Sequence, residues 1–181
     1  VLAGEPVLRT SKQETSQGRS RDLSQLHEQW QTSEWNLTTC AMGTFCAVHF
    51  DGRSKHYLIA DKLGVRALYY YDGVDYVVCS TCLRILEDLD FVQKTIDMTG
   101  LTEKICFGFP LSDRTVYSDI KMLNPSEIIC FEDDKINKSC YWRWDNIPII
   151  KRSEDETLQA VYNKFRCAVK NRIRSDKTVM S

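Results

Sequence analysis

The stretch Ala60-Asp61-Lys62-Leu63-Gly64-Val65-Arg66-Ala67-Leu68-Tyr69-Tyr70 decides how the middle of this chain folds. A strand pattern ends where the stretch begins and another starts at its last residues, so it joins two strands. Gly64 supplies a backbone angle that residues with a side chain avoid, and Asp61 and Arg66 are placed to tie the turn by hydrogen bonds. The chemistry of the stretch alone predicts a conformational corner, which we call the Asp61 corner.

Strand patterns lie on both sides of this corner and come in pairs. Two of the pairs are joined by Asp51-Gly52 and by Asp72-Gly73. Asp-Gly between strand patterns is a strong hairpin signal, because glycine accepts the positive φ that the turn needs. A third turn is expected at Asp133-Asp134. The predicted strands cover residues 44–50 and 57–60, 68–71 and 76–79, and 127–131 and 135–141.

Helical patterns complete the expectation of a mixed α and β chain. Residues 9–22 are polar and predict a loop, followed by a short helix with Asp22 as N-cap and an apolar face that includes Leu26 and Trp30. A short helix is expected over residues 83–89, and another from Thr99 or Thr102. The strongest helix prediction starts at a capping box formed by Ser153 and Glu156. Its apolar face holds Leu158, Val161, Tyr162, Phe165, Val169 and Ile173.

Length and composition bound the class of protein. A chain of 181 residues predicts one domain, or one domain and part of a second. The net charge of −1 excludes a generally basic nucleic-acid binder, and 43% hydrophobic residues can bury a core. No apolar run approaches a membrane span and no secretory leader is visible. Because several of the eight cysteines lie in apolar runs, we expect free thiols and a cytoplasmic protein.

Other chemistry-bearing residues are weaker candidates. Cys79-Ser80-Thr81-Cys82 is a C-x-x-C that fits a redox pair or half a zinc site, but no second pair has zinc spacing, so buried thiols are the better interpretation. No metal ligands are therefore predicted. His49 lies within a strand pattern and is more typical of a satisfied or surface histidine than of a catalytic base. The basic residues after 163 favour a solvated helix face, with phosphate steering left open.

The Asp61 corner resembles the D-x-x-G-x-R-P-L-Y-Y signature of glutamine amidotransferase domains of the N-terminal-nucleophile type, with Ala67 in place of the proline. Other segments resemble the same family in the order found in asparagine synthetases. The relatives with this order include β-lactam synthetases and lasso-peptide cyclases. The matching segments are 42–48, 78–86, 107–110, 114–117, 120–125 with Pro125-Ser126 for the family's PG, Tyr141-Trp142, and the helix 153–175 with Asp176.

The resemblance implies an α+β fold, namely an incomplete four-layer α-β-β-α sandwich over residues 1–144. It further implies a linker at 145–152 and, over 153–181, the first helix of an α/β ligase domain. In this family an N-terminal cysteine attacks the glutamine amide, and a second domain uses ATP and Mg²⁺ to adenylate a carboxylate. We expect the cysteine to lie before Val1 and the nucleotide loop after Ser181. The first hypothesis is thus a fragment of an amide-forming ligase, with no catalytic residue and no bound cofactor in this chain.

The resemblance also proposes glutamine-binding residues. Ala3-Gly4-Glu5 occupies the place of the family's N-G-E, so Gly4 and Glu5 are candidates, and Asp22 is the nearest match to the acidic residue that binds the glutamine amino group. The expected partners are glutamine or another amine and a carboxylate. Ala3 removes an oxyanion donor, a loss that typically costs ~10²–10³ in rate. It favours a second hypothesis, a degenerate non-catalytic module that positions a peptide substrate for a ligase. An unrelated α+β domain is the third.

Overall fold

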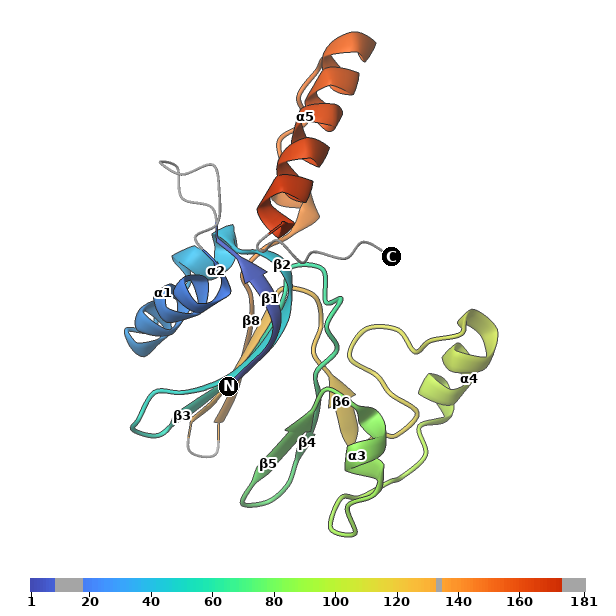
Figure 1. Ribbon diagram of the computed structural model, residues 1–181. Coiled ribbons are helices and arrows are strands. Elements are labelled where there is room, and N and C mark those ends of the chain that lie inside the picture. Colours follow the sequence, from blue (N-terminus) through green and yellow to red (C-terminus); the bar gives the residue numbers. More distant parts are fainter. Residues whose placement is uncertain (9–17, 133–134, 174–181) are drawn as a thin grey trace. The chain divides into compact units, whose positions relative to one another are not determined.

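The computed structural model describes residues 1–8, 18–132 and 135–173. Both the polar stretch 9–17 and the predicted turn at 133–134 lie outside these described residues. Helices are interspersed among groups of consecutive strands (Figure 1). In order they are β1 (Leu2–Val7), α1 (Arg19–Gln31), α2 (Asn36–Cys40), β2 (Met42–Phe50), β3 (Lys55–Ala60), β4 (Tyr69–Asp72), β5 (Val77–Ser80), α3 (Leu83–Glu87), α4 (Met98–Phe107), β6 (Ile120–Met122), β7 (Glu127–Glu132), β8 (Lys135–Cys140) and α5 (Glu154–Arg172).

The chain forms two compact units. Unit 1 comprises residues 1–4 and 44–141, and unit 2 comprises residues 5–43 and 142–181. The boundary therefore passes within β1 and within β2. The domain boundaries expected at 144 and 153 remain predictions.

The strands form two antiparallel sheets. One has five strands in the order β1-β2-β3-β7-β8, and the other has three in the order β5-β4-β6. Register follows the predicted hairpins, with Val48 opposite Leu58 and Tyr70 opposite Cys79. Two antiparallel sheets with intervening helices confirm the α+β class. The complete four-layer sandwich and the ligase helix remain predictions.

The core of unit 1 lies between these two sheets. An apolar cluster there takes side chains from strands of both sheets, namely Cys46, Leu58, Ala60, Ile129 and Phe131 from the larger and Tyr70 from the smaller, together with the nearby Leu68 and Leu123. A second cluster lies on the other face of β4, where Tyr71 and Ile120 pack with Leu86 of α3. Alternating residues of β4 thus serve two cores, as expected for a strand covered on both faces. Unit 1 therefore stacks α3, the smaller sheet and the larger sheet.

The two Asp-Gly turns differ in why they need glycine. Gly52 has φ 81°, as the hairpin rule requires, and the Asp51 carboxylate accepts the Arg53 and Lys55 backbone N–H groups. The same explanation is wrong for Gly73, which does not adopt a positive φ. A Cβ at Gly73 would instead lie 2.8 Å from the Tyr76 ring, so this glycine is needed for close approach.

Two helices start at other residues than the sequence predicts. The helix α1 begins at Arg19 after Gly18, so Asp22 lies inside its first turn and is not its N-cap. The helix α4 is capped by Asp97, whose carboxylate accepts the Thr99 and Gly100 N–H groups, and not by a threonine. In both cases the chain turns into the helix earlier than the apolar periodicity indicates.

Three elements were not predicted: β1, α2 and β6. Within unit 2, α2 is tied to α1 because Trp30 Nε1 donates to the buried Thr38 hydroxyl at 2.7 Å and Leu37 N–H donates to Gln29 at 2.6 Å.

The capping box of α5 is confirmed, with Glu156 N–H donating to Ser153 Oγ and Ser153 N–H donating to the Glu156 carboxylate. In the part of the chain that the structure describes, no helix has the length and apolar character needed to cross a membrane.

Candidate functional site

The Asp61 corner is held by one fully buried carboxylate. Asp61 is 0% exposed and accepts four backbone N–H groups. Its Oδ1 accepts from Leu63 (2.9 Å) and Val65 (3.3 Å), and its Oδ2 accepts from Arg66 (3.1 Å) and Phe45 (3.2 Å). The predicted link between Asp61 and Arg66 is thus confirmed, through the arginine backbone. Gly64 has φ 62°, as the turn was expected to need.

A second turn packs against this corner. A Cβ on Gly64 would lie 3.1 Å from the Pro125 ring. Ser126, which replaces a glycine of the family pattern, has φ 59°. Its N–H donates to the Asp61 carbonyl at 2.9 Å and its hydroxyl donates to the Lys62 carbonyl at 2.9 Å. The departure at Ser126 therefore adds a hydrogen bond to the corner.

Tyr141 closes the corner from the end of unit 1. Its hydroxyl donates to the Ala60 carbonyl at 2.7 Å and its N–H donates to the Ser126 carbonyl at 3.0 Å. Burial, reinforced by the neighbouring Asp61, raises the pKa of the Tyr141 phenol well above its usual range. The phenol therefore stays protonated and remains a donor. The sequence indicated Tyr141-Trp142 only through the resemblance, and no local pattern predicts the hydrogen bond from Tyr141 to the Ala60 carbonyl.

Gly4, a predicted glutamine-binding residue, lies in β1 at a point of very close backbone approach. Its φ is 106°, and a Cβ there would lie 2.3 Å from the Thr44 carbonyl oxygen and 2.8 Å from the Phe45 Cα. Only glycine fits such a position without displacing the backbone of β2. Ala3 beside it is partly buried and packs against the apolar cluster between the sheets.

Glu5 and Asp22, the other two predicted site residues, both engage the first turn of α1. Glu5 pairs with Arg19 (3.1 Å), and both side chains are substantially exposed. Asp22 is only 2% exposed, and its carboxylate accepts the Leu8 N–H at 3.3 Å. The structure therefore brings Glu5 and Asp22 to one helix turn within unit 2. The Asp22 carboxylate therefore has a structural role, and its role in binding glutamine stays a prediction.

Cys46, Cys79 and His49 have packing roles. Cys46 is buried and Cys79 packs against the same apolar cluster, and burial raises the pKa of both thiols. The other member of the C-x-x-C, Cys82, is exposed, so the interpretation of this motif as buried thiols is wrong for Cys82. His49 is buried in β2 and stacks on Tyr57. Within residues 1–8, 18–132 and 135–173, no three His, Cys, Asp or Glu side chains gather as a metal site would require.

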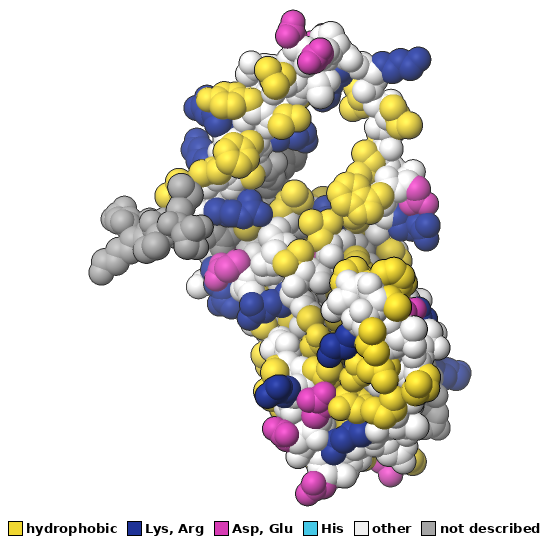
Figure 2. All heavy atoms as spheres, turned by 90° about the vertical axis from the view of Figure 1, so that its right-hand side faces the viewer, with side chains coloured by type: hydrophobic (Ala, Val, Ile, Leu, Met, Phe, Trp, Pro, Cys, Tyr) yellow, Lys and Arg dark blue, Asp and Glu magenta, His cyan; other side chains and the backbone are white. Residues whose placement is uncertain are grey.

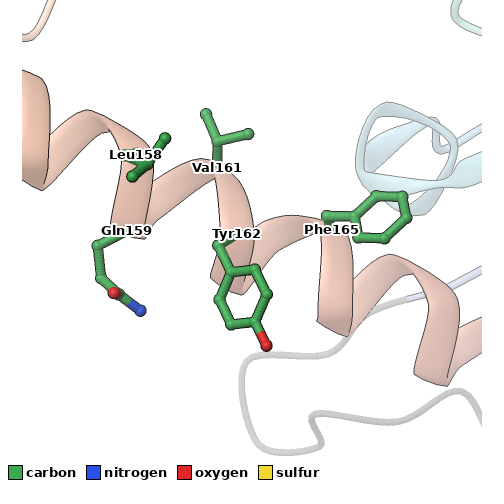
Figure 3. Close-up of a pocket in the computed structure, with 5 residues that line it drawn as sticks. All are labelled: Leu158, Gln159, Val161, Tyr162 and Phe165. Carbon is green, nitrogen blue, oxygen red and sulfur yellow. The ribbon is translucent and has the colours of Figure 1, made fainter.

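Two apolar surfaces lie apart from these residues. Figure 2 shows apolar side chains on the face of unit 1 that carries α4, where Ile105 and Phe109 are exposed. On α5 a shallow apolar surface is formed by Leu158, Val161 and Phe165 with two neighbours, all from this one helix (Figure 3). The predicted apolar face of α5 is therefore real and solvent-exposed, and it forms no enclosed cavity.

The fold and the corner define a class: an α+β protein with two antiparallel sheets packed over one core and joined by a carboxylate-centred turn. Comparison with known families agrees. The family model of the glutamine amidotransferase domain matches residues 10–142, and the chain belongs to this family. None of the curated proteins compared with the chain matches it. The chain thus carries a glutamine amidotransferase domain, a class that implies a small-molecule substrate such as glutamine.

Proposed function

We propose that this chain is the amidotransferase part of an ATP-dependent, amide-forming ligase similar to asparagine synthetases. In this proposal the Ala3-Gly4-Glu5 segment and Asp22 hold L-glutamine or another amine donor. The thioester-forming cysteine and the nucleotide loop belong to residues other than these 181.

One observation carries the proposal: Gly4 has φ 106° and its backbone lies directly against β2. Only glycine lets the segment lie this close to β2, and the resemblance assigns this same segment to the binding of glutamine. The family match supports the same activity class. The resemblance assigns Asp22 to the glutamine amino group and Glu5 to the same segment as Gly4; in the structure Asp22 also accepts the Leu8 N–H and Glu5 pairs with Arg19.

ATP and Mg²⁺ belong to the expected longer protein. Among the described residues, no His, Cys, Asp and Glu side chains form a cluster that could hold a metal ion, so these residues do not fit Mg²⁺. No step of the proposed role of this chain uses them.

The test measures binding of L-glutamine to the 181-residue chain by isothermal titration calorimetry. D-glutamine is the stereochemical control. We expect saturable binding of the L form that is lost in Asp22→Asn, with little ammonia released above the buffer rate. Equal heats from L- and D-glutamine would refute the proposed site. Release of ammonia well above buffer would show that the nucleophile lies within this chain.

A non-catalytic module is the second candidate, and Ala3 favours it. The Ala3 methyl packs against the apolar cluster at the position where the family has an asparagine amide. Without that donor, an oxyanion loses stabilisation that is typically ~10²–10³ in rate. The variant Ala3→Asn, made in a chain with a cysteine restored upstream, distinguishes the two: release of ammonia from glutamine shows that the site has only lost a donor, whereas no release and no binding of glutamine favours a module that positions another substrate.

A further inference from the structure

A series of hydrogen bonds and close contacts within unit 1 links Tyr141, its last residue, to Gly4 of β1. It begins at Tyr141, whose hydroxyl donates to the Ala60 carbonyl at 2.7 Å across 81 positions of sequence. Its N–H engages Ser126, which in turn donates to the Asp61 carbonyl. The end of the domain is thus hydrogen-bonded to both sides of the Asp61 corner.

The corner reaches β2 at more than one residue. Asp61 Oδ2 accepts the buried Phe45 N–H at 3.2 Å, Cys46 Sγ donates to the Ala67 carbonyl at 3.9 Å, and Cys46 lies opposite Ala60 in the β2–β3 ladder. The bond from Phe45 is the one that leads to Gly4. Phe45 and Thr44 are the residues against which Gly4 lies, within reach of a single added Cβ. Because Gly4 has no side chain to wedge it in place, the position of its backbone follows that of the β2 backbone beside it.

We propose that Tyr141 is a positioning residue that, through Ala60, Asp61 and Phe45, fixes the backbone geometry of Gly4. The end of the amidotransferase domain then sets how the glutamine-binding segment is presented. This inference rests on the proposed function for its consequence, but the link between Tyr141 and Gly4 stands on contacts within unit 1. It assigns to Tyr141 a role in binding without any contact with substrate.

The test is a pair of matched variants followed by amide NMR. Tyr141→Phe removes one hydroxyl and its bond to a carbonyl. Tyr76→Phe removes the equivalent bond from an exposed tyrosine to the Phe91 carbonyl, at 3.3 Å, and is the control. We expect Tyr141→Phe to speed hydrogen exchange of the Phe45 amide by about tenfold and to shift the Gly4 amide resonance, whereas the control leaves both unchanged.

A merely structural role would spread small changes over the whole core and leave Gly4 no more affected than other amides, and this result would overturn the proposal. If Tyr141→Phe folds poorly, Ser126→Ala serves instead, because it removes only the hydroxyl bond to Lys62 on the other side of the corner. It should perturb the same two amides more weakly.

Titration with L-glutamine separates this inference from the proposed function. If the unmodified chain binds glutamine, Tyr141→Phe should raise the dissociation constant about three- to tenfold while the control leaves it unchanged. If the unmodified chain binds no glutamine, the proposed function fails, and the Phe45 and Gly4 amides still decide whether Tyr141 positions β1. Unchanged affinity together with a shifted Gly4 amide would overturn the role in binding.

Discussion

Replacing Asp61 by alanine should be among the most destabilising single changes in unit 1. The substitution leaves four backbone N–H groups without their acceptor. A buried donor left unpaired, as at Phe45, costs about 1–3 kcal/mol, and each part-buried donor of the turn costs about 0.5–1 kcal/mol because water reaches it. The expected loss in the free energy of unfolding is about 4 kcal/mol. This is a large share of the ~5–15 kcal/mol that holds a typical domain together.

Urea denaturation followed by circular dichroism measures this loss. Asp51→Ala is the matched control, since the Asp51 carboxylate also accepts backbone N–H groups, from Arg53 and Lys55, but in an exposed hairpin. There the loss should be much smaller, because water takes the place of the lost acceptor. Asp61→Asn should fall between the two, because the amide keeps one acceptor oxygen and turns an NH₂ toward the other donors. If Asp61→Ala loses no more than Asp51→Ala, the corner does not hold the domain together as argued.

Three further outcomes follow from other residues. Gly4→Ala should cost about 2–4 kcal/mol in the same urea assay, whereas Gly18→Ala, with φ 101° and no atom within 4 Å of its Cβ, should cost about 1 kcal/mol; equal losses would contradict the close approach of β1 to β2. The hydrogen bond from Arg114 holds the pKa of Glu103 below its ordinary 4.5. The ionised Glu103 therefore stabilises the folded state above that value, and this stabilisation is lost as pH falls through the lowered pKa. Glu103→Gln should therefore flatten the decline of the urea midpoint below about pH 4.5, and an unchanged acid limb would speak against the pair. Iodoacetamide at pH 8 should label exposed Cys82 at least about tenfold faster than buried Cys46, as read by peptide mass spectrometry, and similar rates would contradict the burial of Cys46.

The hairpins and the corner were predictable because their signals are local. An Asp-Gly pair between alternating residues, or a glycine between Asp61 and Arg66, constrains the backbone within a few positions. The start of α5 belongs to the same kind, since both partners of its capping box lie three residues apart. Such features depend little on the rest of the chain.

The missed features depend on contacts that form only in the folded chain. The strand β1 contains two small residues and a proline, so its own composition gives little strand signal, and pairing with β2 makes it a strand. Gly73 was correctly placed in a turn for the wrong reason, because the Tyr76 ring that it accommodates is recognisable only in three dimensions. Asp22 has the composition of an N-cap, but its carboxylate binds the Leu8 N–H, fourteen residues earlier.

The candidate site contains both the locally predicted Asp61 corner and contacts between distant parts of the chain. The family match covers residues 10–142, which include Asp61 and Tyr141 but not Gly4. If Gly4 binds glutamine as proposed, residues inside the matched region contact the segment that precedes it. Phe45 is one such residue, because its amide donates to Asp61 and its Cα would lie 2.8 Å from a Cβ on Gly4. A substitution that weakens this one hydrogen bond without unfolding the sheets should therefore reduce glutamine affinity before it reduces stability.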